Sequence, residues 1–395
     1  MKGKIASAGS KILENYIATY DSTVVKKLKE AGAVIIGRTN CDEFAMGSST
    51  ENSAYGPTKN PHDVSRVPGG SSGGSAVAVA AGMALGSLGS DTGGSIRQPA
   101  AFCGIVGMKP TYGRVSRSGL IALGSSLDQI GPFAKTAEDA EIIFGAIKGI
   151  DPLDSTTLNE DSKFEIRNSK SALKGGTIGV PRKFIESEGV DERVKQNFQE
   201  TLEKFKSLGY EIKDIELEHA HYSLATYYVI MPAEASSNLA RFDGVKYGLR
   251  EDGKDGIDVY FKTRGRGFGV ETRRRIILGT YVLSSGYYDE YYGSALEMKK
   301  KITDEYRKVF EEVDLILTPT TPTPAFKLGE KSADPLAMYL ADIFTVPANI
   351  AGLPSISLPS GFVEEGGKRL PLGIELMADL GREDIIFQAS KDFLG

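Results

Sequence analysis

The stretch Val67–Pro99, VPGGSSGGSAVAVAAGMALGSLGSDTGGSIRQP, decides the fold. Two glycine-rich turns, at 69–74 and 89–95, flank a run of small apolar residues. Glycine and serine clusters are typical of flexible linkers. Here, however, the run between the turns is Ala- and Val-rich, so it can form a helix that packs closely against a sheet, and an apolar strand is expected soon afterwards at 104–107. The pattern therefore indicates two ordered turns within a packed fold.

The rest of the chain alternates short β-branched runs with longer helical patterns, which predicts an α/β fold. Four runs are expected to be buried strands: Ala33–Ile36, Gly104–Gly107, Thr177–Val180 and Asp314–Leu317. Between Val190 and Leu208 apolar residues recur every three or four positions and Gly209 follows, which predicts an amphipathic helix. The Tyr- and Arg-rich segment 222–292 predicts a helical region around a polar cleft.

Length and composition set limits on organisation and on partners. The chain has 395 residues and a net charge of −5, so it can bury a large core, but it offers no general attraction for phosphate backbones. Length alone leaves the number of domains open. The polar segment Gly149–Lys174 is expected to be a surface connection between an N-terminal and a C-terminal half.

The two cysteines, Cys41 and Cys103, cannot form a disulfide framework, and neither has a metal-ligand partner at short spacing. A reducing, cytoplasmic compartment is therefore expected. The first ten residues lack the apolar core of a signal peptide, and the weakly polar run Ala76–Gly89 is too short to span a bilayer. We expect no membrane association and no metal site.

A serine nucleophile requires a base and backbone N–H groups directed at the developing oxyanion. The turn Thr92–Ser95 can supply such donors, because its two glycines let the backbone fold around a carbonyl group. The three histidines, His62, His219 and His221, do not lie near a G-x-S-x-G elbow, so a Ser-His-Asp triad is poorly supported. Phosphate-binding glycine motifs are also missing from the sequence.

The run GGSSGGS followed by GSDTGGSIRQPAAFCGIVGMKPTYG resembles the amidase signature family. That resemblance implies a triad of Ser, cis-Ser and Lys, with Ser95 as the acyl-ester nucleophile and Ser71 as the cis-serine proton relay. It also implies an oxyanion hole at Thr92, Gly93, Gly94 and Ser95. Ser72 would support the turn through hydrogen bonds, and Asp91 and Arg97 would form a structural pair that braces it.

The same resemblance implies the fold and the domain organisation. The expected fold is a large mixed central β-sheet covered by helices on both faces, and residues 1–395 would form a single amidase signature domain. The helical substrate-site region would lie at about 220–300. Within this fold the Ser/Lys chemistry alone does not fix the acyl group of the substrate.

Three downstream segments narrow the resemblance to the glutamine-hydrolysing members that serve tRNA-dependent amidotransferases. They are YYVIMPAEASSNLARFDGVKYG, FGVETRRRIILGTYVLSSGYYDEYY and DPLAMYLADIFTVPANIAGLP. By resemblance, Arg275 and Asp342 would bind the carboxylate and the ammonium of glutamine, and Tyr227 would close the pocket. Ammonia would pass to subunits B and C, which would hold most of the charged tRNA; ATP and magnesium are expected at the partner, with no cofactor in this chain.

The sequence departs from the family pattern at its ends. The catalytic lysine of the family stands in a Lys-Asp motif, and the family spacing places it before Met1; Lys2, Lys4 and Lys11 do not precede an Asp. The C-terminus also comes soon after 371–380. We therefore expect a chain that is truncated at both ends and lacks the catalytic lysine. Two alternatives stay open: a stand-alone amidase for another small or lipophilic amide, and an inactive truncated subunit that only docks its partners.

This expectation predicts that the 395 residues alone hydrolyse glutamine slowly, because without a neutral amine behind Ser71 the Ser95 hydroxyl stays a weak nucleophile. A version extended upstream with the Lys-Asp segment should hydrolyse glutamine faster in a side-by-side glutaminase assay. Equal rates would contradict this interpretation.

Overall fold

The computed structural model describes residues 1–158 and 175–395. Its strands are β1 (Gly86–Asp91), β2 (Val106–Lys109), β3 (Gln129–Ala134), β4 (Thr177–Val180), β5 (Glu211–Asp214), β6 (Leu315–Pro319), β7 (Ser355–Glu365) and β8 (Lys368–Ala378). They form one 8-stranded sheet in the order β1-β3-β2-β7-β8-β6-β4-β5. The β4–β5 and β4–β6 pairs are parallel and the others are antiparallel, so the sheet is mixed.

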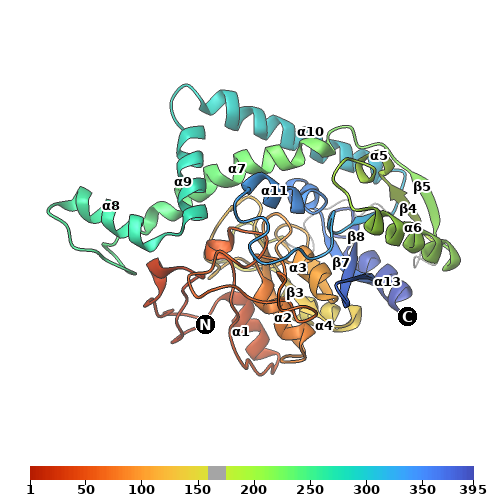
Figure 1. The fold of residues 1–395 in the computed structure, drawn as a ribbon, viewed down its shortest axis with the longest axis horizontal. Helices are drawn as coiled ribbons and strands as arrows, with labels where there is room; N and C mark the ends of the chain where they lie inside the picture. Colours follow the sequence, from red (N-terminus) through yellow and green to blue (C-terminus); the bar gives the residue numbers. More distant parts are fainter. Residues whose placement is uncertain (159–174) are drawn as a thin grey trace.

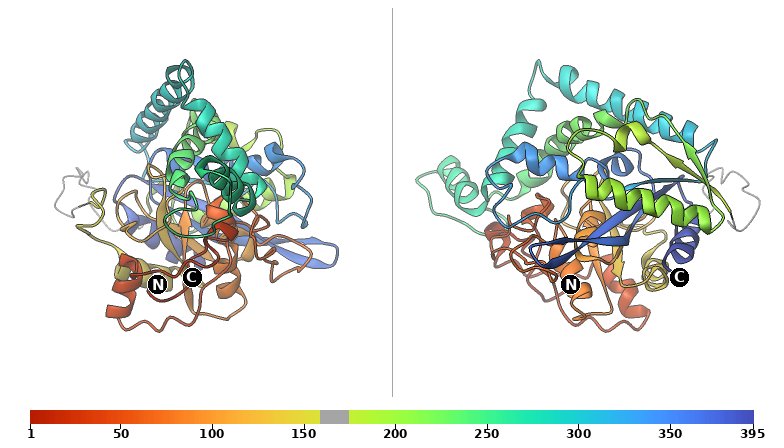
Figure 2. Two further views of the ribbon diagram at one scale, coloured as in Figure 1. Left: turned by 90° about the vertical axis from the view of Figure 1, so that its left-hand side faces the viewer. Right: turned by 45° about the vertical axis from the view of Figure 1, so that its right-hand side comes forward.

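Helices cover both faces of the sheet (Figures 1 and 2). One face packs against α1 (Thr23–Glu30), α4 (Ala137–Ile147), α6 (Glu192–Ser207) and α13 (Glu383–Leu394), and the other packs against α7 (Ser223–Asn238), α10 (Ser294–Val309) and α12 (Val346–Ile350). The side chains of β6 follow the strand period of two: Leu315 and Leu317 join the first core, and Ile316 joins the second. This arrangement confirms the expected fold.

Six further α-helices lie within the described residues. They are α2 (Gly73–Ala80), α3 (Arg97–Cys103), α5 (Arg182–Ile185), α8 (Gly256–Gly267), α9 (Val270–Val282) and α11 (Pro335–Tyr339). The α7 and α9 helices approach each other so closely that a Cβ atom at Gly279 would lie 1.8 Å from the backbone oxygen of Pro232. This glycine therefore fixes the distance between α9 and α7.

Several predicted elements are confirmed, and one is wrong. The strand at Thr177–Val180 and the helix within 190–208 are present, and β2 and β6 begin within two residues of their predicted starts. No strand forms at Ala33–Ile36, where the side chains of Val34 and Ile36 are 86% and 71% exposed. A β-branched run becomes a strand only where it can pair and pack, and this run has no partner strand in the described sheet.

Residues 223–309 are mostly helical, and α8 projects from the body on the left of Figure 1. The expected connection 149–174 is described only as far as 158, and the rest of it lies outside the described residues. Within the described ranges, no helix is both long enough and apolar enough to cross a membrane.

Candidate active site

The two glycine-rich turns lie against each other. The first precedes α2 and carries Ser71, and the second joins β1 to α3 and carries Ser95. The Ser72 N–H donates a hydrogen bond to the backbone oxygen of Ser95 at 3.2 Å. The side chains of Ser71 and Ser95 are both buried, and the Gly70–Ser71 peptide bond is cis. Two segments that are well separated in the sequence thus place their serines in one buried region.

Side chains lock the first turn in place. The Ser72 hydroxyl donates to the Ser90 oxygen at 3.1 Å and accepts from the Ser90 N–H at 3.2 Å, which confirms its predicted supporting role. The Gly70 N–H donates to Oε1 of Gln98 on α3 at 2.9 Å. A Cβ atom at Gly70 would lie 2.3 Å from Oδ2 of Asp42, so the turn can approach this carboxylate only with glycine here.

A buried ion pair at Asp91 and Arg97 braces the second turn, as predicted. Both side chains are fully buried, and the guanidinium binds the carboxylate through Nε and Nη2 at 3.1 and 2.9 Å. The Asp91 carboxylate also accepts the N–H groups of Gly94 and Ile96 at 2.8 and 3.0 Å. Burial acts to raise the pKa of Asp91, but the Arg97 guanidinium outweighs it and lowers this pKa to about 2. The carboxylate is therefore ionised and sets the shape of the turn.

Arg97 also ties the turn to the far strands. Its Nη1 binds Glu375 of β8 at 2.6 Å and the backbone oxygen of Thr345 at 2.8 Å, and its Nη2 binds Oδ1 of Asn349 on α12 at 2.5 Å. The Asn349 amide returns a hydrogen bond to Asp91 at 2.9 Å. Sequence reasoning missed Glu375 and Asn349, because no local pattern marks a contact across so many residues.

The backbone amides of the second turn differ in their availability. The Gly94 N–H donates to Asp91 and is therefore engaged. Within residues 1–158 and 175–395, the N–H groups of Thr92, Gly93 and Ser95 form no hydrogen bond with other protein groups. Of the four residues expected to form an oxyanion hole, three thus keep an unengaged donor.

Arg275 lies on α9 and is buried, whereas its neighbours Arg273 and Arg274 are exposed. Its Nε donates to Glu271 at 2.7 Å, and its guanidinium lies 5.3 Å from the ring centres of both Tyr228 and Tyr339. Two aromatic faces and one carboxylate therefore hold a cation inside the protein.

Asp342 stands in a short 3₁₀ helix, Leu340–Asp342, and is buried. Its Oδ2 accepts a hydrogen bond from the Ser48 hydroxyl, whereas its Oδ1 has no partner among the described residues. Burial raises the pKa of Asp342 to about 7, although Ser48 and Arg275 act in the opposite direction. This carboxyl group therefore changes its charge close to neutral pH.

The structure brings Asp342 and Tyr227 to the turn that carries Ser95. The Thr345 hydroxyl lies within hydrogen-bonding distance of the backbone oxygens of Gly93, at 2.8 Å, and Asp342, at 3.1 Å. The ring of Tyr227 packs on Gly93, where a Cβ atom would lie 2.8 Å from the ring carbon Cζ. Glycine is required at this position because the ring takes the space of a side chain.

Buried polar atoms of this region that lack a partner among the described residues include Ser49 Oγ, Ser71 Oγ, Asp342 Oδ1 and Glu375 Oε2. Buried polar groups are rarely left unpaired in proteins, so such a group points to a ligand or a catalytic role. The exposed Lys2, Lys4 and Lys11 form no contact with Ser71.

The histidines have other partners. His62 lies 3.0 Å from the Cys103 backbone oxygen, and His219 lies 3.1 Å from Glu305, while His221 is exposed. Cys103 itself is buried, and burial raises the pKa of its thiol. In the described contacts none of the three histidines is bonded to Ser71 or Ser95, so the two serine turns meet without a histidine.

Comparison with known protein families matches residues 1–387 to the family described as Amidase. The chain belongs to the amidase signature family. Among its relatives in that family is the A subunit of the glutamyl-tRNA(Gln) amidotransferase of Desulfatibacillum aliphaticivorans, 54% identical over 99% of this chain and 81% of the relative. The protein of the same name from Microcystis aeruginosa is 56% identical over 98% of this chain and 80% of the relative.

A solved amidase-family structure agrees with these relatives. The A subunit of the glutamyl-tRNA(Gln) amidotransferase of Thermotoga maritima superposes with a TM-score of 0.81 and is 47% identical, covering 98% of this chain and 79% of its own. The likeness extends over nearly all of this chain, so it includes both glycine turns and the helices that carry Arg275 and Asp342.

The brace predicts a large loss of stability when Arg97 is removed. In Arg97→Ala the carboxylates of Asp91 and Glu375 stay buried without their cation, so we expect the free energy of unfolding to fall by roughly 3–5 kcal/mol. Arg193→Ala is the matched control, because its pair with Asp191 is exposed and should contribute less than about 1 kcal/mol. Urea denaturation measures both; similar losses would contradict a special role for the buried pair.

Proposed function

We propose that this chain is the glutamine-hydrolysing subunit of a tRNA-dependent amidotransferase that converts Glu-tRNA(Gln) to Gln-tRNA(Gln). The observation that carries the proposal is the meeting of the two serine turns beside a buried Arg275 and a half-paired Asp342. The relatives with this name are 54–56% identical over nearly the whole chain. Residues 1–395 are proposed to be one amidase signature domain, with the helices at about 220–300 bordering the substrate.

In the proposed reaction Ser95 Oγ attacks the side-chain amide carbon of glutamine. Ser71 Oγ accepts the Ser95 proton as it releases its own proton towards the leaving nitrogen, which departs as ammonia and leaves an acyl ester on Ser95; a neutral amine behind Ser71 would speed this relay. Water then hydrolyses the ester to glutamate and regenerates Ser95. The N–H groups of Thr92, Gly93 and Ser95 stabilise the oxyanion in both steps. The Ser71 hydroxyl has no hydrogen-bond partner among the described residues, so it is not engaged elsewhere and can accept the Ser95 proton when the two hydroxyls approach each other.

Recognition of glutamine follows from charge. Arg275 would bind the α-carboxylate through its guanidinium, and Asp342 would bind the α-ammonium through its unpartnered Oδ1. Tyr227, packed on Gly93, would close the pocket over the reacting amide. A free amino acid is the substrate class that satisfies both charges at once.

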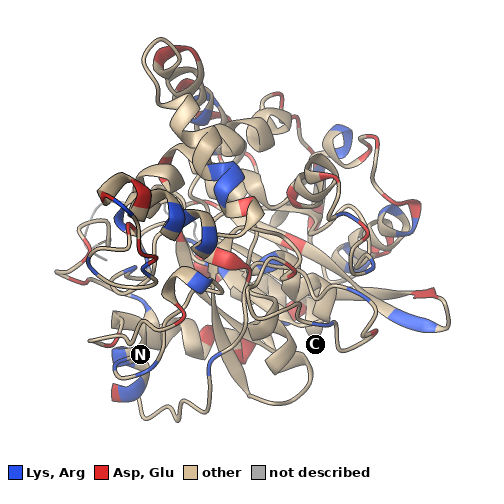
Figure 3. Ribbon diagram, turned by 60° about the vertical axis from the view of Figure 1, so that its left-hand side comes forward, with Lys and Arg blue, Asp and Glu red and all other residues tan. Residues whose placement is uncertain are grey.

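The chain is proposed to work in the cytoplasm with subunits B and C. Ammonia released at Ser95 would pass to the partner that binds ATP, magnesium and most of the charged tRNA. The net charge of −5 supports a partner as the main tRNA-binding subunit. In the view of Figure 3 acidic and basic residues are interspersed over the fold, which is consistent with this division of roles.

Replacing Arg275 tests the carboxylate clamp. Arg275→Ala should lower kcat/KM for glutamine by roughly 10- to 100-fold, because a charge-assisted hydrogen bond to the substrate is lost. The matched control is Arg274→Ala, since Arg274 is exposed and also pairs with Glu271. Steady-state glutaminase kinetics measure kcat/KM for each variant, and a thermal melt checks that each variant is folded. Unchanged glutamine kinetics with Arg275→Ala would favour the alternative of an amidase for lipophilic amides.

The titration of Asp342 predicts a pH profile. Because burial raises its pKa to about 7, this carboxyl is protonated and uncharged at lower pH, where it cannot attract an ammonium group. We expect kcat/KM for glutamine to rise as the pH increases from about 6 to about 7.5. Asp342→Asn should be less active and should lose this rise. A parallel rise in Asp342→Asn would assign the titration to another group, such as Asp42, whose pKa burial also raises to about 7.

A further inference from the structure

Thr92, the first residue of the nucleophile turn, is held by a carboxylate that the reaction described above does not use. The Thr92 hydroxyl donates to Oδ1 of Asp128 at 2.6 Å, and both side chains are buried. The same carboxylate accepts the N–H of Gly124 at 3.2 Å and the N–H of Leu123 at 2.9 Å. Asp128 thus joins the loop 123–128 to the turn that carries Ser95.

Helix α7 fixes one side of this loop. The Asn238 amide donates to the Leu123 oxygen and to the Ser125 hydroxyl, both at 3.0 Å. Glu234 accepts the N–H of Ser126 at 2.9 Å. The loop therefore cannot move without breaking contacts to the same helix that carries Tyr227.

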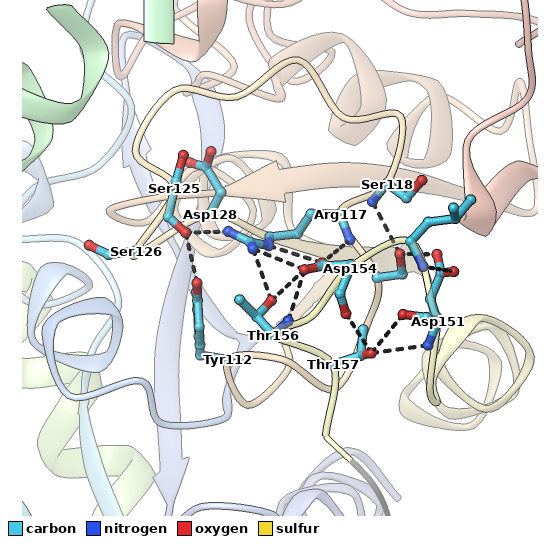
Figure 4. Close-up of polar contacts among 12 residues, drawn as sticks. Tyr112, Arg117, Ser118, Ser125, Ser126, Asp128, Asp151, Asp154, Thr156 and Thr157 are labelled. Carbon is cyan, nitrogen blue, oxygen red and sulfur yellow. Dashed lines mark hydrogen bonds and ion pairs between the residues drawn. The ribbon is translucent and has the colours of Figure 1, made fainter. Parts of the chain in front are cut away.

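A second group of side chains holds the loop through the backbone oxygen of Ser125 (Figure 4). The Tyr112 hydroxyl donates to the Ser125 oxygen at 2.7 Å, and the Arg117 guanidinium donates to the same oxygen. Arg117 is itself paired with Asp154 at 3.1 Å. Asp128 therefore stands on a loop that is anchored at both sides, which makes it a fixed point for Thr92.

Every other residue of the turn has its own anchor. The Gly93 oxygen faces the Thr345 hydroxyl, the Gly94 N–H binds Asp91, and the Ser95 oxygen accepts from Ser72. For Thr92 the hydroxyl bond to Asp128 is the side-chain anchor. The peptide unit between Thr92 and Gly93 depends on it, and that unit carries the Gly93 N–H.

We propose that Asp128 is a positioning residue for amide hydrolysis: by holding the Thr92 hydroxyl it keeps the N–H groups of Thr92 and Gly93 directed at the oxyanion. This inference rests on the proposed function, since it assumes that Ser95 is the nucleophile. Asp128 itself touches neither substrate nor Ser95 in this role. A hydrogen bond from a hydroxyl to a carboxylate is short and strong, and a 2.6 Å separation fits such a bond.

The effect should appear in kcat rather than in KM. Loss of one oxyanion donor typically lowers kcat by roughly 10²–10³-fold. A donor that is present but misdirected should therefore lower kcat by a smaller factor. Ground-state binding of glutamine depends on Arg275 and Asp342, which do not contact Asp128. A lower kcat with an unchanged KM is therefore expected when a positioning residue is removed. If activity fell only because less protein was folded, the loss of activity would follow the fall in melting temperature.

The test compares Thr92→Val, which keeps the side-chain shape but removes the hydroxyl, with Thr92→Ser, which keeps the hydroxyl. Glutaminase kinetics are measured in whichever is faster of the 395-residue chain and the upstream-extended form. We expect Thr92→Val and Asp128→Asn each to lower kcat by about tenfold or more, with KM changing less than about twofold. Thr92→Ser should stay within about threefold of the parent, and Thr92→Val combined with Asp128→Asn should be no slower than the slower single variant.

Thr201→Val is the matched control, because Thr201 is a buried threonine of α6 that donates to the Asn197 oxygen away from the turn. It should leave kcat unchanged while reporting what a buried Thr→Val exchange does to the melting temperature. An unchanged kcat in Thr92→Val, or an equal loss in Thr92→Ser, would overturn the positioning role.

Ser95→Ala separates this inference from the proposed function. If it abolishes glutaminase activity while Thr92→Val is fully active, the role of Asp128 fails and the proposed function stands. If Ser95→Ala stays active, or if both parent forms are inactive on glutamine, the proposed function and the inference fail together.

Discussion

The site depends on one buried interaction, the ion pair between Asp91 and Arg97. Asp91 ends β1 and Arg97 begins α3, so the pair spans the turn that carries Ser95. The carboxylate accepts two backbone N–H groups of that turn, and the guanidinium reaches β8 and α12. A buried ion pair is by itself weak evidence that a protein is stable, because apolar residues of the same volume can often replace the pair without lowering the free energy of unfolding. Here the carboxylate has a directional task that apolar side chains cannot perform, since it orients peptide units.

The charges around this pair are balanced within a single buried cluster. Glu375 adds a second carboxylate, whose pKa burial raises, and Ser355 donates to it at 2.5 Å. Lys109 adds a second cation; burial, followed by the neighbouring Arg97, lowers its pKa to about 7, and its Nζ donates to the Pro110 oxygen at 2.9 Å. Because the cluster joins β1, β2, α3, α12 and β8, the turn that carries Ser95 is fixed by the sheet and not by its own flexible glycines.

The parts of this site that depend on local sequence can be predicted. The parts that depend on contacts between residues distant in the chain cannot. Glycine and serine at fixed spacing predict the two turns, and the period of apolar residues predicts α6. The β-branched run Ala33–Ile36 misleads, because strand formation needs a neighbour that the local sequence does not contain. Asp128 and Glu375 carry no local signal either, since their roles arise from contacts with turns distant in the chain. Arg275 is singled out by the family resemblance and not by a local signal: three arginines stand in a row, and in the helix Arg275 is the buried one.

The polarity of the pocket also bears on the choice of substrate. Arg275 is a buried cation held by Tyr228, Tyr339 and Glu271, and Asp342 keeps one oxygen unpartnered in the described part of the chain. A lipophilic amide would leave Oδ1 of Asp342 without a partner and would offer Arg275 no hydrogen bond in addition to the one with Glu271, and a buried polar atom without a partner is unfavourable. An amino acid amide presents a carboxylate and an ammonium that can compensate them. A site built to hydrogen-bond its substrate strongly rejects an analogue that lacks the matching polar group. An apolar pocket rejects an analogue with one added hydroxyl group much more weakly. If Arg275 and Asp342 bind the substrate as proposed, the same two side chains favour a zwitterion over a lipophilic amide.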